Sequence, residues 1–159
     1  MGVANEATAG QGGDRNVVSI TGDRSFATAG NGGDDNSATV VGTDSVASIG
    51  QGSRNSATAR GDDTTAIAGA GSDNSSVAEG DNARAETING NGNSATADGA
   101  RSDAFAGDGD NNTAEASSGG TARAEGDSQF ACADEPGETA INTDRCGPPP
   151  ATETVEAFD

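Results

Sequence analysis

Short runs in which small or apolar residues alternate with polar ones recur along the chain. The runs 55–59 and 64–68 each place alanine at every second position. Alternation with a period of two is typical of a β-strand that buries one face and exposes the other. The segments 61–63 and 69–73 are rich in glycine and aspartate, which favour turns. We therefore predict two strands and two turns between residues 55 and 73.

The same pattern repeats along most of the chain with a period near 19 residues. Asparagine marks one position of the repeat, and the steps between its successive copies are 20, 19, 19, 19 and 19 residues. A fixed period of this length is typical of a solenoid, in which each repeat forms one coil. The prediction is an all-β, two-sheet β-solenoid (β-roll) with a 19–20-residue coil and an alanine-lined core. The marking residues are Asn16, Asn36, Asn55, Asn74, Asn93 and Asn112.

The repeat loses phase after Ala116. Short alternating runs at 121–124, 130–133 and 139–141 predict degenerate strands, and an atypical last coil predicts a cap over the end of the solenoid. Beyond them, three consecutive prolines favour a linker or a disordered end. The predicted divisions are a regular β-solenoid at 1–118, degenerate coils and a cap at 119–146, and a Pro-rich disordered tail at 147–159.

The two cysteines, Cys132 and Cys146, lie close together in the sequence. A disulfide between them would close a short loop, staple the cap and add about 3 kcal/mol of stability by restricting the unfolded chain. It would also favour an oxidising, extracellular setting. The alternative is a pair of free thiols.

Composition taken alone points to a disordered chain. Only 31% of the 159 residues are hydrophobic, tryptophan and tyrosine are absent, and the net charge is −18. The periodicity overrides that expectation, because a random low-complexity sequence would not keep asparagine in register through six repeats.

The charge and the missing residue types narrow the functional classes. The 26 acidic residues face only 8 arginines, which argues against binding nucleic acid or an anionic membrane surface. We expect no membrane insertion, because no apolar run is long enough to span a bilayer. The chain contains no histidine, so histidine-based acid–base catalysis is excluded, and we expect no enzymatic activity. We expect no cofactor and assign no metal site.

Three sets of positions are the candidate functional residues. The asparagine column predicts a side-chain ladder in which each amide bonds to the amide of the next coil, although asparagine is also simply a good turn residue. Outward positions of the first strand predict a flat Ser/Thr binding face: Ser37, Thr39, Ser56, Thr58, Ser75, Ser94 and Thr96. Outward positions of the second strand predict an exposed apolar contact patch: Phe26, Val46, Ile67 and Phe105.

The segment Gly52-Ser53-Arg54-Asn55-Ser56-Ala57 resembles the curlin repeat of bacterial curli fibres, in which a Gly-x-x-Asn-x-Ala turn joins two strands per coil. The pattern recurs at 13–18, 33–38 and 71–76, with a shorter period than in curlin and without its regular glutamine. The Ala-x-Ala-x-Gly rhythm of 95–99 is similar to the head repeats of trimeric autotransporter adhesins. Both resemblances imply an extracellular structural or adhesive role.

Two further resemblances supply alternatives. The Gly- and Asp-rich turn 32–35 resembles the calcium-binding nonapeptides of repeats-in-toxin proteins, which implies a calcium-stabilised repeat protein. The column does not keep aspartate throughout, since Arg54 and Gly92 occupy equivalent positions. The flat Ser/Thr array resembles that of bacterial ice-binding solenoids, which implies ice (antifreeze) binding.

The leading hypothesis is a non-enzymatic structural protein, either an extracellular self-assembling fibre subunit or a cell-surface adhesin or stalk element. The first coil has no evident cap, and its open edge favours self-association as a head-to-tail fibre or a homo-oligomer. Ice binding and calcium-dependent stabilisation are the alternatives.

Overall fold

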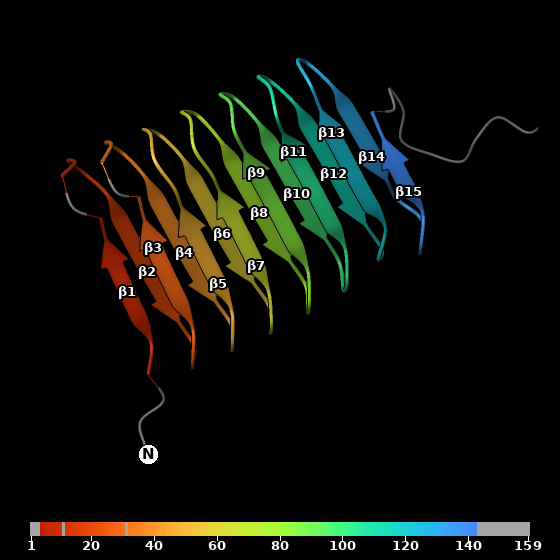
Figure 1. The fold of residues 1–159 in the computed structure, drawn as a ribbon. Helices are drawn as coiled ribbons and strands as arrows, with labels where there is room; N and C mark the ends of the chain where they lie inside the picture. The colour runs from red at the N-terminus through yellow and green to blue at the C-terminus, as the bar shows by residue number, and fades with distance from the viewer. Residues whose placement is uncertain (1–3, 11, 31, 143–159) are drawn as a thin grey trace, which may run out of the picture.

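The computed structural model describes residues 4–10, 12–30 and 32–142, and these form a parallel β-solenoid of about seven turns (Figure 1). Every regular element in these ranges is a β-strand. Nothing in them is a helix of the length and apolarity that crossing a bilayer requires. The chain runs along one sheet, turns, and returns along the other, so that two strands and two turns make one coil.

Successive strands alternate between the two sheets, and each strand pairs in parallel with the strand two places along the chain. The eight-stranded sheet contains β1 (Glu6–Ala9), β3 (Phe26–Ala29), β5 (Val46–Ile49), β7 (Thr65–Ala68), β9 (Arg84–Ile88), β11 (Asp103–Gly107), β13 (Thr121–Glu125) and β15 (Thr139–Ile141). The seven-stranded sheet contains β2 (Val17–Thr21), β4 (Ser37–Val41), β6 (Ser56–Arg60), β8 (Ser75–Glu79), β10 (Ser94–Asp98), β12 (Thr113–Ser117) and β14 (Phe130–Ala133).

The register between coils preserves the sequence repeat. In the seven-stranded sheet, Thr58 lies beside Thr39 on one side and Val77 on the other. Each side chain therefore stacks on the equivalent side chain of the neighbouring coil, at the spacing of about 4.8 Å that separates paired strands. The predicted two-sheet solenoid with a coil of about 19 residues is confirmed.

The degenerate runs near the end of the described chain also form strands. β13, β14 and β15 extend the same two sheets in register, with β14 on β12 and β15 on β13. The three strands predicted at 121–124, 130–133 and 139–141 are therefore confirmed. The loss of phase in the sequence reflects shorter turns, because the strand pairing continues unchanged.

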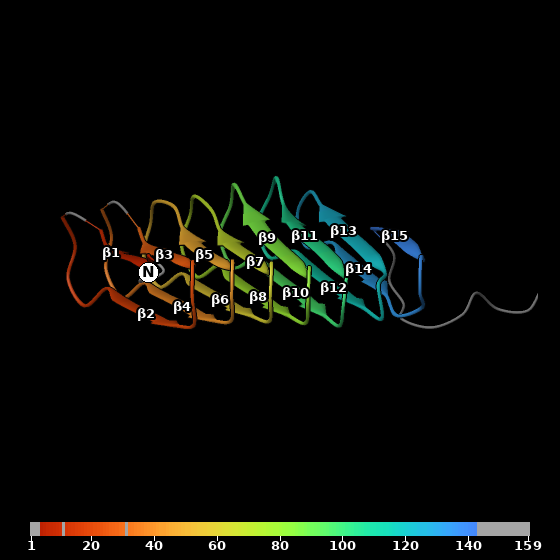
Figure 2. The same ribbon diagram turned by 90° about the horizontal axis from the view of Figure 1, so that it is seen from below.

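The interior between the sheets is narrow, and Figure 2 shows the two sheets as closely spaced layers. Most of the buried apolar side chains are alanines, and Val40 and Ile49 are the large aliphatic exceptions. One buried pair is polar: the Ser76 hydroxyl lies 3.2 Å from that of Thr87 and donates to the Ile67 carbonyl. Because each buried methyl contributes only about 0.8 kcal/mol, hydrogen bonding between coils carries much of the stability.

Glycine columns at the turns allow the coils to stack this closely. Gly71 has a φ of 123°, and a Cβ built on it would lie 1.8 Å from the carbonyl oxygen of Gly90 in the next coil. Gly52 stands in the same relation to Gly71. A side chain at these positions would force adjacent coils apart, so the glycines are required by the stacking as well as by the turn.

Candidate functional site

Asparagine side chains line one corner of the solenoid and connect each coil to the next. The Nδ2 of Asn74 donates to the Gly90 carbonyl at 2.8 Å, and its Oδ1 accepts a bond of 3.0 Å from the backbone N–H of Asn93. The same pair of bonds recurs for Asn36 and Asn55. From Asn36 onward these side chains are buried. The corner is a continuous ladder of side-chain to main-chain bonds, which we call the Asn ladder.

The Asn ladder differs in detail from the sequence prediction. We expected each amide to bond to the amide of the next coil, and the structure instead pairs each amide with two main-chain groups. The Nδ2 donates to a turn glycine carbonyl of the next coil, and the Oδ1 accepts from a backbone N–H of that coil. The ladder ends where Gln129 replaces asparagine, and its N–H donates to the Asn112 Oδ1 at 2.8 Å.

A second ladder, at the opposite corner, was not predicted. It begins with Asn5 and continues through buried hydroxyl groups. The Ser45 Oγ donates to the Gly61 carbonyl at 2.7 Å and accepts from the N–H of Thr64 at 3.1 Å. The signal was present in the sequence, since serine or threonine precedes the second strand at Ser25, Ser45, Thr64 and Ser102, with Ala83 interrupting.

The residue before each ladder position adopts a left-handed backbone. Positive φ values occur at Arg54 (59°), Asp73 (63°) and Gly92 (68°). Aspartate, asparagine and glycine tolerate this conformation best. The glycine at position 92 fits this conformation, whereas the arginines at 15 and 54 adopt it without that preference.

Arginine and aspartate at these positions form ion pairs between adjacent coils. Arg54 contacts both carboxylate oxygens of Asp73 at 2.7 Å, and Arg15 pairs in the same way with Asp35. The hydrogen bond from each guanidinium is the main cause that lowers the pKa of Asp73 and of Asp35. These pairs are exposed, so each contributes little to stability.

Other turn carboxylates accept main-chain N–H groups from the preceding coil. The N–H of Asp14 donates to Asp34 at 2.7 Å, and that of Thr43 donates to Asp62 at 2.9 Å. Serine and asparagine take the same role elsewhere in the column, as at Ser53. Among the described residues, no group of three histidine, cysteine or acidic side chains is placed to hold a metal ion. The turn acids therefore have a structural use, which is to bond one coil to the next.

The predicted Ser/Thr face lies on the outer surface of the seven-stranded sheet. Its members form two in-register columns, and all are half-buried by their neighbours along the column. Val77 interrupts one column, and Glu115 follows Thr96 at its end. The structure thus brings the predicted face together as a flat surface of hydroxyl groups two residues wide.

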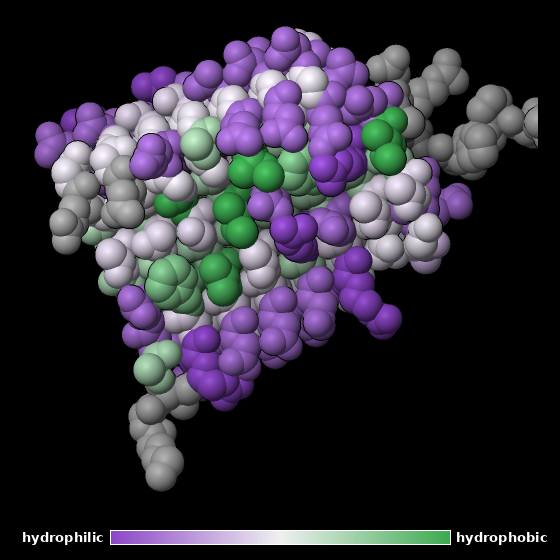
Figure 3. Space-filling model, viewed as in Figure 1, coloured by the Kyte–Doolittle hydropathy of each residue, from purple (hydrophilic) through white to green (hydrophobic). Residues whose placement is uncertain are grey.

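The predicted apolar patch lies on the outer surface of the eight-stranded sheet, where Figure 3 shows apolar side chains as a broken band between polar ones. Phe26 and Val46 are neighbours in register and half-buried. The prediction that Phe105 is exposed was wrong, because it is only 8% exposed. The guanidinium of Arg123, on the next strand, stacks 4.3 Å from its ring centroid and covers it. The patch is therefore shorter than predicted.

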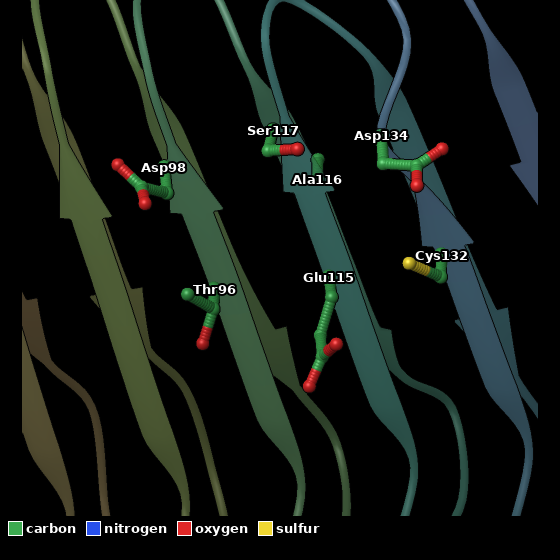
Figure 4. A pocket seen from close by; sticks show the side chains of 7 residues that line it. All are labelled: Thr96, Asp98, Glu115, Ala116, Ser117, Cys132 and Asp134. Atoms are coloured by element: carbon green, nitrogen blue, oxygen red, sulfur yellow. The ribbon is translucent and has the colours of Figure 1, made fainter. Parts of the chain in front are cut away.

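A shallow hollow of about 330 Å³ lies on the seven-stranded sheet near its β14 end (Figure 4). Figure 4 shows that Thr96 and Asp98 come from β10, Glu115 from β12 and Cys132 from β14, with Asp134 just beyond β14. Its lining contains three carboxylates and no lysine, arginine or histidine. This arrangement offers no acid–base pair of opposite charge.

Cys132 is buried on β14, 5% exposed. Cys146 lies outside the described residues, so the disulfide between the two stays a prediction.

The two ends of the solenoid differ. At the β1 end the inward-facing Ala7 and Ala9 are exposed, and Val18 and Ile20 of β2 are only partly buried. At the other end the inward-facing alanines are buried, although no further described strand follows: Ala131, Ala133 and Ala140. Among the described residues, the interior is thus open at the β1 end alone.

Comparison of the chain with protein-family models, with curated proteins and with solved structures finds no match.

Proposed function

We propose that this protein has a non-enzymatic structural role, as a stiff extracellular rod that associates with further copies of itself in a fibre, stalk or adhesive surface structure. The observation that carries the proposal is the open β1 end. In the described part of the chain, the ladders of hydrogen bonds stop there without a cap, and the interior of the solenoid is exposed. An edge of this kind can pair with another chain.

The hydrogen bonds that the polar side chains make support a structural role. The asparagines, the corner hydroxyl groups and several turn carboxylates are all committed to bonds between coils. The hollow of Figure 4 is lined by carboxylates with no lysine, arginine or histidine among them. The asparagines, hydroxyl groups and turn carboxylates that bond one coil to the next are not available for catalysis.

The extracellular setting follows from the predicted disulfide and from the resemblance to curlin and autotransporter repeats. The net charge of −18 favours solubility and disfavours nucleic acid and anionic lipid as partners. Self-association is therefore the proposed partnership.

Negative-stain electron microscopy at low salt and at about 1 M salt tests the proposal. Repulsion between acidic copies is screened at high salt, so paired or longer rods should become more abundant there. Light scattering on the same samples supplies the mass. Isolated rods of single-chain mass at every salt concentration and pH would contradict self-association.

Ice binding is the second candidate, favoured by the two in-register hydroxyl columns. Thr58 lies in the middle of this face, so Thr58→Tyr would place a bulky ring on the flat surface. If the face binds ice, thermal hysteresis should be present in the parent protein and fall several-fold in the variant. Equal hysteresis in both proteins, or none in the parent, would remove this candidate. Thr65→Tyr, on the opposite sheet, is the matched control.

A further inference from the structure

The main chain at the β1 end offers a defined set of unused hydrogen-bonding groups. In a parallel strand, the N–H and C=O of one residue point to the same neighbour, and successive residues point to opposite sides. Glu6 and Gly10 donate toward β3, to the carbonyls of Ser25 and Ala29. The N–H and C=O groups of the intervening Ala7 and Ala9 therefore point away from β3, into the open edge.

The same reasoning applies to β2. Val17 donates to the Asn36 carbonyl, and the Thr21 carbonyl accepts from Gly42, so both residues face the β4 side. Val18 and Ile20 consequently direct their main-chain groups into the open edge, and in the described part of the chain no strand lies beyond β1 or β2. The residues with free edge groups are the same four whose inward side chains are incompletely buried.

We propose that this end is a docking surface for the same end of a second copy, forming a closed two-fold dimer in which β1 of each copy pairs antiparallel with β2 of the other. The proposal rests on the self-association proposed above and narrows it from a growing fibre to a closed pair.

The difference between the two ends favours a closed dimer over a filament. Head-to-tail growth needs two complementary open ends on each copy, whereas an isologous contact uses one surface twice and then closes. The inward alanines at the β14–β15 end are buried, and those at the β1 end are exposed. Joining the two exposed ends covers both at once.

The helical rise of the coil selects which strands meet. β2 lies about half a coil further along the solenoid axis than β1, or roughly 2.4 Å. A two-fold axis perpendicular to the sheets would pair β1 with β1 but leave the β2 strands too far apart to bond. An axis parallel to the strands places β1 opposite β2 at two junctions of equal spacing, so both can close together.

A register that satisfies the free groups follows directly. With Ala7 opposite Ile20 of the second copy, Ala9 falls opposite Val18 of that copy. Residues facing in this way form hydrogen-bonded pairs that exchange both N–H···O bonds, which gives about eight bonds over the two junctions. All four side chains point into the shared interior, where each alanine meets a larger aliphatic residue and the two cores become continuous.

Sedimentation equilibrium of the full chain at about 1 M salt tests the geometry, with Ile20→Lys as the disrupting variant. We expect the parent protein to reach twice the chain mass of 15.3 kDa and to stop there as concentration rises. Ile20→Lys would bury an unpaired charge in the junction and should weaken the dimer about 100-fold or more. Ile141→Lys, at the opposite end where the side chain is 57% exposed, is the matched control and should leave the dimer unchanged.

A second variant keeps the test decisive if Ile20→Lys fails to fold. Ala9→Pro removes an N–H that points to the open edge, so the monomer should keep its circular dichroism spectrum while the dimer weakens. Growth of the parent beyond two chains would overturn the closed dimer while leaving self-association intact. A parent mass of one chain would overturn both. A folded Ile20→Lys or Ala9→Pro protein that dimerises as tightly as the parent would overturn the assigned surface.

Discussion

Replacing Asn74 with alanine is expected to lower the free energy of unfolding by about 4 kcal/mol. The change removes the bond to the Gly90 carbonyl and the acceptor of the Asn93 N–H, and leaves a half-buried carbonyl and a buried N–H without these partners. Each unsatisfied buried group costs about 1–3 kcal/mol. In a chain of this size the melting temperature should fall by roughly 10 °C, measured by circular dichroism.

Two companion variants separate the parts of this effect. Asn74→Asp keeps an acceptor for Asn93 but places a carboxylate oxygen against the Gly90 carbonyl, so it should also be strongly destabilised. Ser75→Ala, the next residue on the outer face, should change the melting temperature by about 2 °C or less, as surface substitutions usually do. If Asn74→Ala melted at the same temperature as Ser75→Ala, the Asn ladder would not be a main source of stability.

The second large effect is expected for Gly71→Ala. The added Cβ would meet the Gly90 carbonyl oxygen at 1.8 Å, a distance that only separation of the coils can relieve. Separation would break the bond from the Asn74 Nδ2 to the Gly90 carbonyl and the bond from the Gly90 N–H to the Ala70 carbonyl. We expect a loss of more than about 4 kcal/mol, or failure to fold, seen in urea unfolding followed by circular dichroism.

Gly32→Ala is the matched control, because Gly32 also has a positive φ, of 79°, but a Cβ added there would have no atom within 4 Å. This substitution should cost only the conformational penalty of a left-handed alanine, about 1–2 kcal/mol. Equal destabilisation by the two substitutions would show that φ alone, and not the close approach of the coils, explains the glycine column.

The fold could be predicted from the sequence because each coil of a solenoid repeats the same pattern of strand and turn residues. The alternation at 55–59 and the regular asparagines fixed both the strand and the coil length. The same repetition identified β13 to β15, where inward alanines persist although the turns shorten. The sequence therefore predicted the features that depend on the length of the repeat and on which face of a strand a residue occupies.

The details that the sequence did not reveal depend on contacts across coils. Each amide bonds to a glycine carbonyl and to a backbone N–H of the next coil, and no single repeat specifies these partners. Phe105 is covered because Arg123 happens to lie on the adjacent strand, in a column where the earlier coils carry shorter or acidic side chains. The buried hydroxyl groups of the second ladder were not predicted, because serine and threonine are also common in exposed turns.

Each coil bonds only to the coils directly before and after it, so a whole coil can be removed or added with little effect on the others. Segment 74–92 is one coil, and it contains both members of the buried Ser76–Thr87 pair. Excising it would join Asp73 to Asn93, leaving Asn55 beside an asparagine as before and the Arg54–Asp73 pair in place. Inserting a duplicate would likewise preserve the Asn ladder, although it would add a second Ala83 to the hydroxyl ladder. The rod can therefore be lengthened or shortened in steps of about 4.8 Å with the bonds of the Asn ladder preserved, which makes its length open to evolutionary change.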